Sequence, residues 1–163
     1  EQVQERIKGP ALDSGRVRLE TVEPFVPFTA AGYTVTALPA QHGTRQPLVY
    51  IIQKDGKALL YAHDTSSFDE ETWNWLENSG LHLDLVSMDC TAGIVPINYR
   101  GHMNFERDVA FAERLRQAGV IDDRTRLIAN HFSHNGCISY DDALDPAVNG
   151  GLEISYDGMT VEI

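Results

Sequence analysis

The sequence has little cysteine and no long hydrophobic run. Its two cysteines, Cys90 and Cys137, stand apart rather than in a C-x-x-C spacing, which favours free thiols in a cytosolic protein over a disulfide scaffold. No apolar run approaches the roughly 18 residues of a membrane span. The N-terminal stretch EQVQERIKGP is polar and mixed in charge, so no signal peptide is visible. We therefore expect a soluble, cytoplasmic protein.

Basic residues are also scarce. The chain has 13 lysines and arginines against 24 acidic residues, which gives a net charge of −11. Such an acidic surface argues against sequence-independent binding to a nucleic-acid backbone, but it does not exclude a small phosphorylated substrate held by a metal. With 163 residues, 42% of them apolar, the chain is long enough for one globular domain, 1–163, with a sizeable core.

Apolar patterning predicts a mixed α/β domain. Strands are expected at 16–23, 33–40, 47–53, 57–63, 83–88 and 125–130, with a closing hairpin of 151–156 and 159–163. Helices are expected at 69–79, at 104–119 and, over a short stretch, near 141–145. In 104–119, Asn104 is the predicted N-cap, and Phe105, Val109, Ala112 and Leu115 form the apolar stripe. This order of elements places at least one helix layer on a sheet.

Four polar side chains stand just past the carboxyl ends of predicted strands. His42 follows 33–40, Asp64 follows 57–63, Asp89 follows 83–88 and His131 follows 125–130. Sites form at the carboxyl ends of parallel strands, because the rigid sheet holds these ends while the loops open to solvent. Imidazole and carboxylate donors suit zinc, manganese or iron. His102 lies just before the 104–119 helix, where the helix dipole favours a neutral, hydrogen-bonding ring.

Each of these residues also has a simpler interpretation. A single histidine beyond a strand is usually a loop residue bonded to backbone, and Asp64 could merely begin a turn. Strand alternation points His63 away from Asp64, so we interpret it as structural, and His82 lies in a polar loop that we expect at the surface. Four coincident strand-end positions are harder to explain in this way.

A series of short motifs adds a family resemblance. In order, the chain contains LPAQHG, LLYAHDTS, RGHMNF, ANHFSH and a closing ISYDGMTVEI. Together they resemble the second half of a metallo-β-lactamase-fold hydrolase, and they are most similar to the PhnP-like phosphodiesterases, which open a cyclic phosphate on ribose. The resemblance begins near Gly32 and implies an α/β metallo-β-lactamase-like αββα sandwich, mainly its C-terminal half.

The resemblance implies a role for each histidine of these motifs and for one aspartate. His42 resembles a ligand of a first metal ion, Asp64 the carboxylate that bridges two metals, and His131 a ligand of the second. His102 resembles a non-ligand histidine that contacts the phosphate or the leaving oxygen. His134 resembles the second histidine of an HxxH turn in or near the substrate pocket, with a loop hydrogen bond that merely shapes the turn as the alternative.

One family motif has no counterpart. The H-x-H-x-D-H run that supplies most ligands of both metals is missing, and the chain starts at Glu1 rather than at methionine. We therefore expect the chain to be a C-terminal portion whose N-terminal half is absent. The complete enzyme would hold two divalent metal ions, zinc or manganese, that share a hydroxide for in-line attack on phosphorus. Occupancy of the metals in this chain by itself is doubtful.

The function predicted is metal-dependent hydrolysis of a phosphodiester in a small cyclic or nucleotide-like phosphate. One alternative is a catalytically inactive fragment or assembly module that pairs with another chain through a large apolar surface. Another is a relative of the tRNA-processing endonucleases of the same fold, which the acidic exterior disfavours. The expected partners are a small phosphorylated substrate and either a second copy of the chain or the missing N-terminal half, with no membrane and no nucleic acid.

Overall fold

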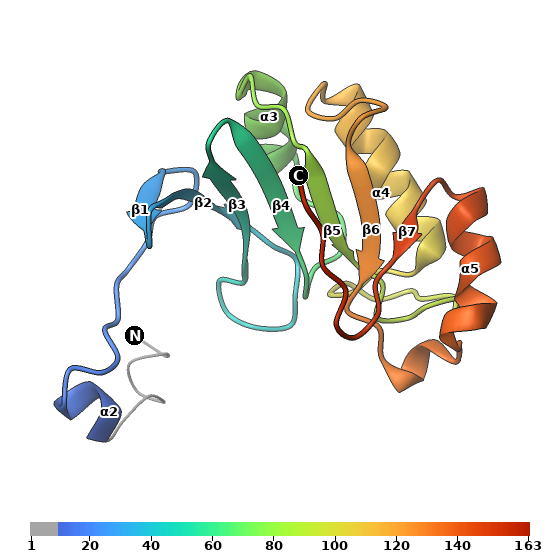
Figure 1. Cartoon of the computed structure of the whole chain (residues 1–163), viewed down its shortest axis with the longest axis horizontal. Coiled ribbons are helices and arrows are strands. Elements are labelled where there is room, and N and C mark those ends of the chain that lie inside the picture. Colours follow the sequence, from blue (N-terminus) through green and yellow to red (C-terminus); the bar gives the residue numbers. More distant parts are fainter. Residues whose placement is uncertain (1–9) are drawn as a thin grey trace.

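Seven strands form one mixed sheet in the computed structural model, which describes residues 10–163 (Figure 1). The strands are β1 (Phe28–Ala30), β2 (Tyr33–Pro39), β3 (Leu48–Lys54), β4 (Lys57–Ala62), β5 (Leu85–Asp89), β6 (Arg126–Asn130) and β7 (Glu153–Ile154). They lie in sequence order across the sheet. Neighbours from β1 to β4 are antiparallel, whereas β4, β5, β6 and β7 are parallel. Strands β2, β4, β5 and β6 therefore all end at the same edge of the sheet.

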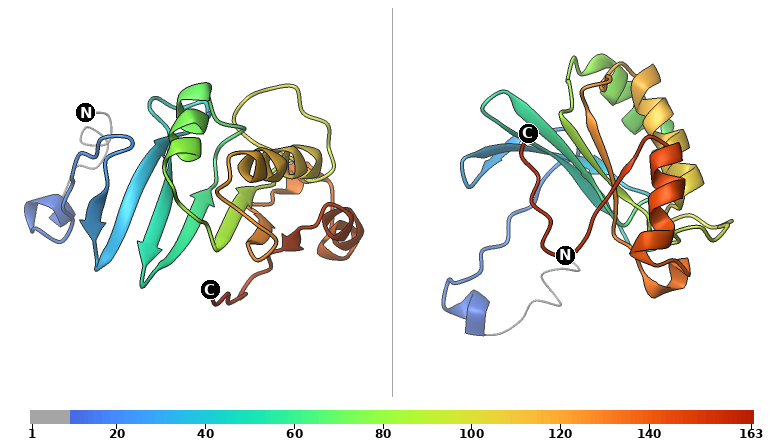
Figure 2. Two further views of the ribbon diagram at one scale, coloured as in Figure 1. Left: turned by 90° about the horizontal axis from the view of Figure 1, so that it is seen from above. Right: turned by 45° about the vertical axis from the view of Figure 1, so that its right-hand side comes forward.

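The helices are α2 (Pro10–Asp13), α3 (Glu70–Asn78), α4 (Phe105–Gln117) and α5 (Tyr140–Asn149), with a 3-10 turn η1 (His134–Gly136). Helices α3, α4 and α5 connect successive parallel strands, as parallel pairing requires. Figure 2 shows α3 and α4 on the same side of the sheet, and α5 beside its β7 edge. Within residues 10–163, no helix combines the length and the apolar composition needed to cross a membrane.

The core lies between the sheet and helices α3 and α4. Alternate residues along the strands face these helices and are fully buried, among them Leu38, Ile51, Leu60, Val86 and Met88. They belong to one cluster with the buried side chains of the two helices, Trp73, Leu76, Phe111 and Leu115. Burial of each large apolar side chain contributes about 1.5–3 kcal/mol relative to exposure. This packing fixes the positions of the strand ends.

The opposite face of the sheet is apolar but less covered. The strand register places Tyr50, Ile52, Leu59 and Tyr61 on this face, and Tyr61 is 44% exposed. The segment after β7 passes over the part of this face that lies near β5 and β6 (Figure 1). We call this surface the open face.

Two predicted strand segments were wrong. Residues 16–23 alternate in polarity but form no strand, since β1 and not this segment pairs with β2. The predicted closing hairpin is also absent: Asp157-Gly158 does form a turn, but 159–163 forms no strand. The physical reason is that β7 reaches the sheet parallel to β6 through α5, and the chain after the turn crosses the open face instead of returning along β7.

Helix α4 confirms its predicted start but not the whole predicted stripe. The Asn104 side chain accepts a hydrogen bond from the backbone N–H of Arg107, as an N-cap should. Phe105, Ala112 and Leu115 are buried, but Val109 is 39% exposed. The predicted helix 69–79 corresponds to α3, and the one predicted near 141–145 is the longer α5.

Asp108 is an acidic residue inside the core. Its exposure is 0%, and apart from the weak thiol donor of Cys90 its carboxyl oxygens have no hydrogen-bond partner among the described residues. Burial raises the pKa of Asp108 well above its ordinary value of 3.8. The folded state therefore keeps a proton that the unfolded chain releases above that value. The free energy of unfolding must therefore decrease as pH rises from 3.8 to the raised pKa of Asp108 in the folded state.

We predict that Asp108→Asn raises the melting temperature of the natural protein, because the amide has no proton to lose. The gain should reach a few degrees at about pH 8, since about 1 kcal/mol corresponds to roughly 2–4 °C, and it should shrink towards about pH 5. Melting curves at several pH values measure this. The matched control is Asp145→Asn on exposed α5, which should give no pH-dependent gain. A constant difference across the pH range would contradict a protonated Asp108.

Candidate metal centre

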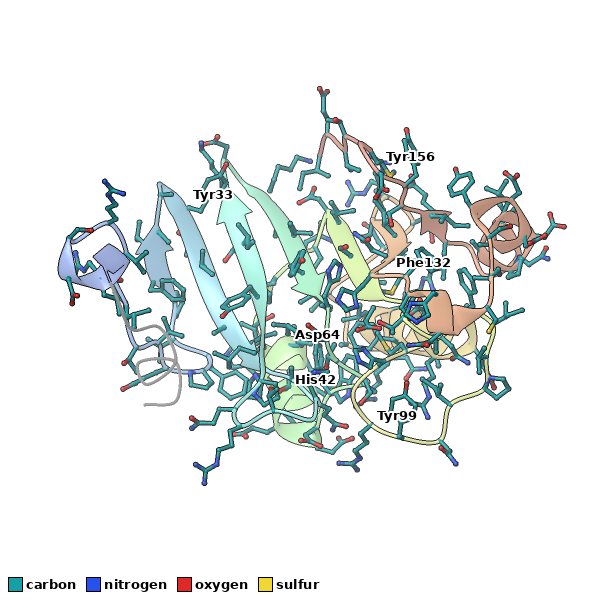
Figure 3. The ribbon with its side chains drawn as sticks, turned by 90° about the horizontal axis from the view of Figure 1, so that it is seen from below. Tyr33, His42, Asp64, Tyr99, Phe132 and Tyr156 are labelled. Carbon is teal, nitrogen blue, oxygen red and sulfur yellow. The ribbon has the colours of Figure 1, made fainter. Side chains whose placement is uncertain are left out.

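The predicted site residues come together at the carboxyl edge of the sheet. His42 follows β2, Asp64 follows β4 and His131 follows β6, and these alternate strands all end at the same edge of the sheet. The Asp64 carboxylate lies between the two rings, with Oδ1 at 3.9 Å from His42 Nε2 and 3.7 Å from His131 Nε2. Figure 3 shows His42 and Asp64 at this edge. The structure thus brings the three residues together, while their role as metal ligands stays a prediction.

The backbone at the site is strained at two non-glycine residues. Asp64 has φ 51° and His131 has φ 60°, both in the left-handed region. Such a conformation costs roughly 1–2 kcal/mol for an L-residue, so the surrounding contacts must hold it. His131 directly follows β6, and Asp64 stands one residue beyond the end of β4, so each left-handed turn lies just past the end of a strand. Strain of this kind is typical of functional sites.

The buried carboxylate of Asp89 organises these turns. Its exposure is 0%, and Oδ2 accepts hydrogen bonds of 2.9 Å from the backbone N–H of Asp64 and from His102 Nδ1. Its Oδ1 accepts from the backbone N–H groups of Thr91 at 3.0 Å and Met103 at 3.3 Å. Four donors satisfy a charge that burial would otherwise penalise heavily. Asp89 therefore holds the turn after β4, the loop after β5 and His102 in one arrangement.

The tautomer of His42 follows from its backbone partner. Its Nδ1 lies 3.1 Å from the carbonyl oxygen of Gly101, which can only accept, so Nδ1 carries the hydrogen. The lone pair of the neutral ring is then on Nε2, the atom that faces Asp64. Gly101 has φ 129°, and a Cβ there would lie 3.3 Å from His42 Nδ1. Glycine is therefore the residue that fits between this strained loop and the ring.

The tautomer of His131 follows from Thr91. The hydroxyl of Thr91 donates to the carbonyl oxygen of His131 at 3.0 Å, so its oxygen accepts from His131 Nδ1 at 2.8 Å. The lone pair of His131 is again on Nε2, towards Asp64. Metal-binding histidines are commonly oriented by such a hydrogen bond from the other ring nitrogen. His42, Asp64 and His131 thus form a set of donors that share the Asp64 carboxylate, and we call them the donor set. The group of ligand atoms that all lie within 4.8 Å of one another includes Asp64 and His131 but not His42.

His102 is arranged differently from the other two histidines. Its Nδ1 donates to buried Asp89, which leaves Nε2 without a protein partner among the described residues. One ligand atom from each of Asp64, Asp89, His102 and His131 lies within 4.8 Å of the others. We assign Asp89 to positioning rather than to binding, because its two oxygens already accept four hydrogen bonds.

The remaining histidines lie outside this donor set. His63 contacts Ser87 Oγ through Nε2 at 2.8 Å, and burial, together with nearby His131, lowers the pKa of His63 to about 4. Its ring is therefore neutral, in keeping with a structural role. His82 is at the surface, 3.9 Å from Asp122. His134 is exposed at the start of η1, and no described residue forms a hydrogen bond or ion pair with its ring, so its catalytic role stays a prediction.

Sequence reasoning did not identify the residues that orient the histidines. Thr91 and Gly101 act through contacts 40 and 59 residues away along the chain. The local signals were weak: Thr91 stands two residues after a strand-end aspartate, and Gly101 stands directly before His102. Neither position predicts which histidine it contacts.

A sheet edge that carries two oriented histidines and a shared carboxylate, with helices packed on one face of that sheet, defines an α/β domain with a metal-type centre. The chain belongs to the beta-lactamase superfamily domain family, whose model matches residues 1–132. The predicted metallo-β-lactamase-like α/β fold is thereby confirmed.

Solved structures share this fold. The metallo-beta-lactamase fold protein YhfI from Bacillus subtilis is 22% identical, with a TM-score of 0.60, and the match covers 82% of this chain and 50% of that one. A new diphosphatase from the PhnP family is 18% identical, with a TM-score of 0.60 and coverage of 84% and 46%. Zn²⁺-bound PqqB from Methylobacterium extorquens is 16% identical, with a TM-score of 0.59 and coverage of 88% and 55%.

The chain spans about half the length of these solved structures. A comparison with curated proteins gave no match. At these identities the likeness concerns the fold, so the reaction must be argued from the site itself.

We predict that Thr91→Val lowers the affinity of the natural protein for zinc by about 10–100-fold, the usual effect of losing a partner that orients a ligand. Valine keeps the shape of threonine but cannot accept from His131 Nδ1. Competition with a chromogenic chelator measures the affinity. Thr34→Val, the same change at an exposed position of β2, is the control and should bind zinc normally. Equal affinity in both variants would show that Thr91 does not set the tautomer.

Proposed function

We propose that this domain forms part of the active site of a metal-dependent hydrolase that cleaves a phosphodiester in a small cyclic or nucleotide-like substrate. The observation that carries the proposal is the Asp89–His102 pair, whose imidazole ring stands beside the donor set of His42, Asp64 and His131. A proton-transfer group next to a cation site is the arrangement that hydrolysis of a charged ester needs.

The Asp64 carboxylate would hold a cation together with His131 Nε2 on one side or with His42 Nε2 on the other. A divalent ion there, zinc or manganese, would supply Lewis acidity towards a phosphoryl oxygen and towards water. Asp64 is 56% exposed and lies between both histidines, so its carboxylate is available to more than one ion. Two ions need more protein ligands than these three residues offer.

His102 is suited to exchange a proton with the substrate. The hydrogen bond to Asp89 keeps a hydrogen on Nδ1 and fixes the plane of the ring, so Nε2 is the atom left for proton transfer. His102 is 4.9 Å from His42 between ring centres and 3.9 Å from Asp64 between Nδ1 and Oδ1. In this role His102 Nε2 takes a proton from the attacking water and passes it to the leaving oxygen, as the water oxygen bonds to phosphorus and the bond from phosphorus to the leaving oxygen breaks.

The proposed substrate is small because of the charge on the domain. A net charge of −11 repels an extended phosphate backbone, whereas a single phosphodiester can be held by cations and by a few donors in the site. A diphosphatase of the PhnP family has a similar fold, which is compatible with a phosphoester substrate.

We also propose that a β-rich partner covers the open face. Its apolar side chains include the 44% exposed Tyr61, and a cavity of about 680 Å³ on this face extends to His131. Apolar area of this kind is stabilised by burial, and sheets commonly pack face to face. This partner would be a second copy of the chain or another part of the natural protein. In either case the partner could bring further metal donors close to His131.

We predict that His102→Ala in the natural protein keeps its metal but loses phosphodiesterase activity by about 10²–10⁴-fold, the usual range for a positioned acid–base group. Elemental analysis gives the metal content, and hydrolysis of bis(p-nitrophenyl) phosphate gives the rate. His82→Ala removes a surface histidine and should leave both unchanged. A fall in metal content in His102→Ala would make His102 a ligand and contradict its assignment.

We predict that residues 1–163 expressed alone hydrolyse bis(p-nitrophenyl) phosphate poorly, even with added zinc or manganese. The reason is the small number of metal ligands, since three side chains are too few to fix the geometry of the site. Displacement of a reacting group by about 1 Å can cost roughly 100-fold in rate. The uncovered open face should also make this chain self-associate. Turnover by the isolated chain at the rate of the natural protein would show that the site is complete within these residues.

A further inference from the structure

His42 and Asp64 lie close together although the strands before them are not neighbours. They follow β2 and β4, which have β3 between them (Figure 1). Neighbouring strands are about 4.7–4.9 Å apart, so the ends of β2 and β4 are separated by about 9–10 Å. His42 Nε2 is nevertheless 3.9 Å from Asp64 Oδ1. The segments after β2 and β4 therefore need a link across the end of β3 to keep this spacing.

On the other side of Asp64 the strand in the middle supplies such a link. Strand β5 lies between β4 and β6 and ends at this edge in Asp89, whose carboxylate accepts from the backbone N–H of Asp64. Two residues later, Thr91 bonds to His131. Strand β3, in contrast, is antiparallel to its neighbours and begins at this edge with Leu48. It has no strand-end carboxylate here, so the link must come from the loops.

Gln41 forms this link through its backbone and its side chain. Its backbone N–H donates to the hydroxyl of Thr65 at 3.0 Å, and its backbone carbonyl accepts from the N–H of Ser66 at 3.1 Å. Its side-chain carbonyl accepts from the Ser66 hydroxyl at 3.2 Å. Thr65 is 0% exposed and Ser66 is 5% exposed, so both partners are removed from water. The residue before His42 is thus bonded to the two residues that follow Asp64.

The amide nitrogen of Gln41 connects the same link to helix α3. It donates to the carboxylate of Asp69, the N-cap residue of α3. An aspartate in this position usually accepts from the first backbone N–H groups of its own helix, but the Asp69 side chain forms no such bond. The buried side chains of Trp73 and Leu76 fix α3 in the core. Through Asp69 the packed helix therefore limits how far the His42 loop can move.

We propose that Gln41 is a positioning residue, which holds the His42 loop against the turn at Asp64 and thereby keeps His42 Nε2 within reach of a cation on the Asp64 carboxylate. Without the Gln41 amide, the loop keeps only the hydrogen bonds of its backbone and of the His42 ring. Nε2 is then free to move away from Asp64.

The effect should be confined to one side of the shared carboxylate. His131 is oriented by Thr91, and neither residue bonds to Gln41. The proposal rests on the part of the proposed function in which His42 and Asp64 hold a cation, and it does not depend on the reaction that follows.

The first test measures zinc binding to the natural protein by competition with a chromogenic chelator. Gln41→Leu keeps a side chain of similar size but removes both amide bonds. It should weaken zinc binding by about 10–100-fold, the usual effect of losing a residue that orients a ligand. Gln117→Leu removes an exposed amide at the end of α4 and should bind zinc as the wild type does. Wild-type affinity in Gln41→Leu would overturn the proposal.

An exchange of donor and acceptor tests the hydrogen bond to α3 without an apolar substitution that could impair folding. Gln41→Glu places a second carboxylate against Asp69, so zinc binding should weaken as in Gln41→Leu. Adding Asp69→Asn supplies an amide that donates to the new carboxylate, and asparagine is also a good N-cap residue. This double variant, whose net charge equals that of the wild type, should recover most of the affinity. A double variant as weak as Gln41→Glu would contradict the role of this bond.

The second test is a double-mutant cycle that separates positioning from general destabilisation. Gln41→Leu is combined with His42→Ala and, separately, with His131→Ala. If Gln41 acts through His42, its effect on zinc affinity should disappear in the His42→Ala background and persist in the His131→Ala background. An equal effect in both backgrounds would show that Gln41 only stabilises the fold, and the proposal would then be wrong.

A measurement without metal distinguishes failure of this proposal from failure of the proposed function. If His42→Ala binds zinc as the wild type does, His42 is not a ligand and that part of the proposed function fails. Nitrogen NMR of the metal-free protein above about pH 8, where histidine rings are neutral, still decides the positioning. The wild type should show the Nδ1–H tautomer that the Gly101 carbonyl selects. A mixture of tautomers in Gln41→Leu supports positioning by Gln41, and an unchanged tautomer contradicts it.

Discussion

The carboxylate of Asp89 is the group on which the arrangement of the site depends. It lies at the end of a fully buried strand, and each of its oxygens accepts two hydrogen bonds. These bonds hold the left-handed turn at Asp64 and the orientation of His102. A buried charge is costly without such partners, so the loops that supply the donors and the carboxylate stabilise one another.

The helix-covered face of the sheet stabilises the fold, whereas the carboxyl edge of the strands carries the polar groups of the site. Side chains such as Leu60 and Met88 are buried against α3 and α4 and make the strand ends rigid. Polar groups at those ends then need only short loops to converge. The loop before α4 links the packed helix to the site. Arg107 in the first turn of that helix donates hydrogen bonds to loop carbonyls, and the carbonyl of Gly101 in the same loop orients His42. Helix packing therefore affects the precision of the site.

Several features of the fold could be predicted from local sequence. The Asp-Gly turn between two apolar runs gave the β3–β4 hairpin, and Asn104 with the periodic residues after it gave α4. Two segments at the two ends of the sheet were predicted wrongly. Residues 16–23 alternate as a strand would, but β1 takes the edge of the sheet next to β2. Residues 159–163 follow a real turn, but they cross the open face because β7 runs parallel to β6.

The sequence by itself determined which residues stand at the strand ends, because strand periodicity and chain direction are local properties. It thereby placed His42, Asp64, Asp89 and His131 at one edge. Only the tertiary structure decided what each side chain does there. Which ring nitrogen carries the hydrogen is set by Thr91 and Gly101, and which carboxylate is buried is set by packing around Asp89. These assignments depend on contacts between residues far apart in the chain, and such contacts exist only once the sheet and its loops are folded.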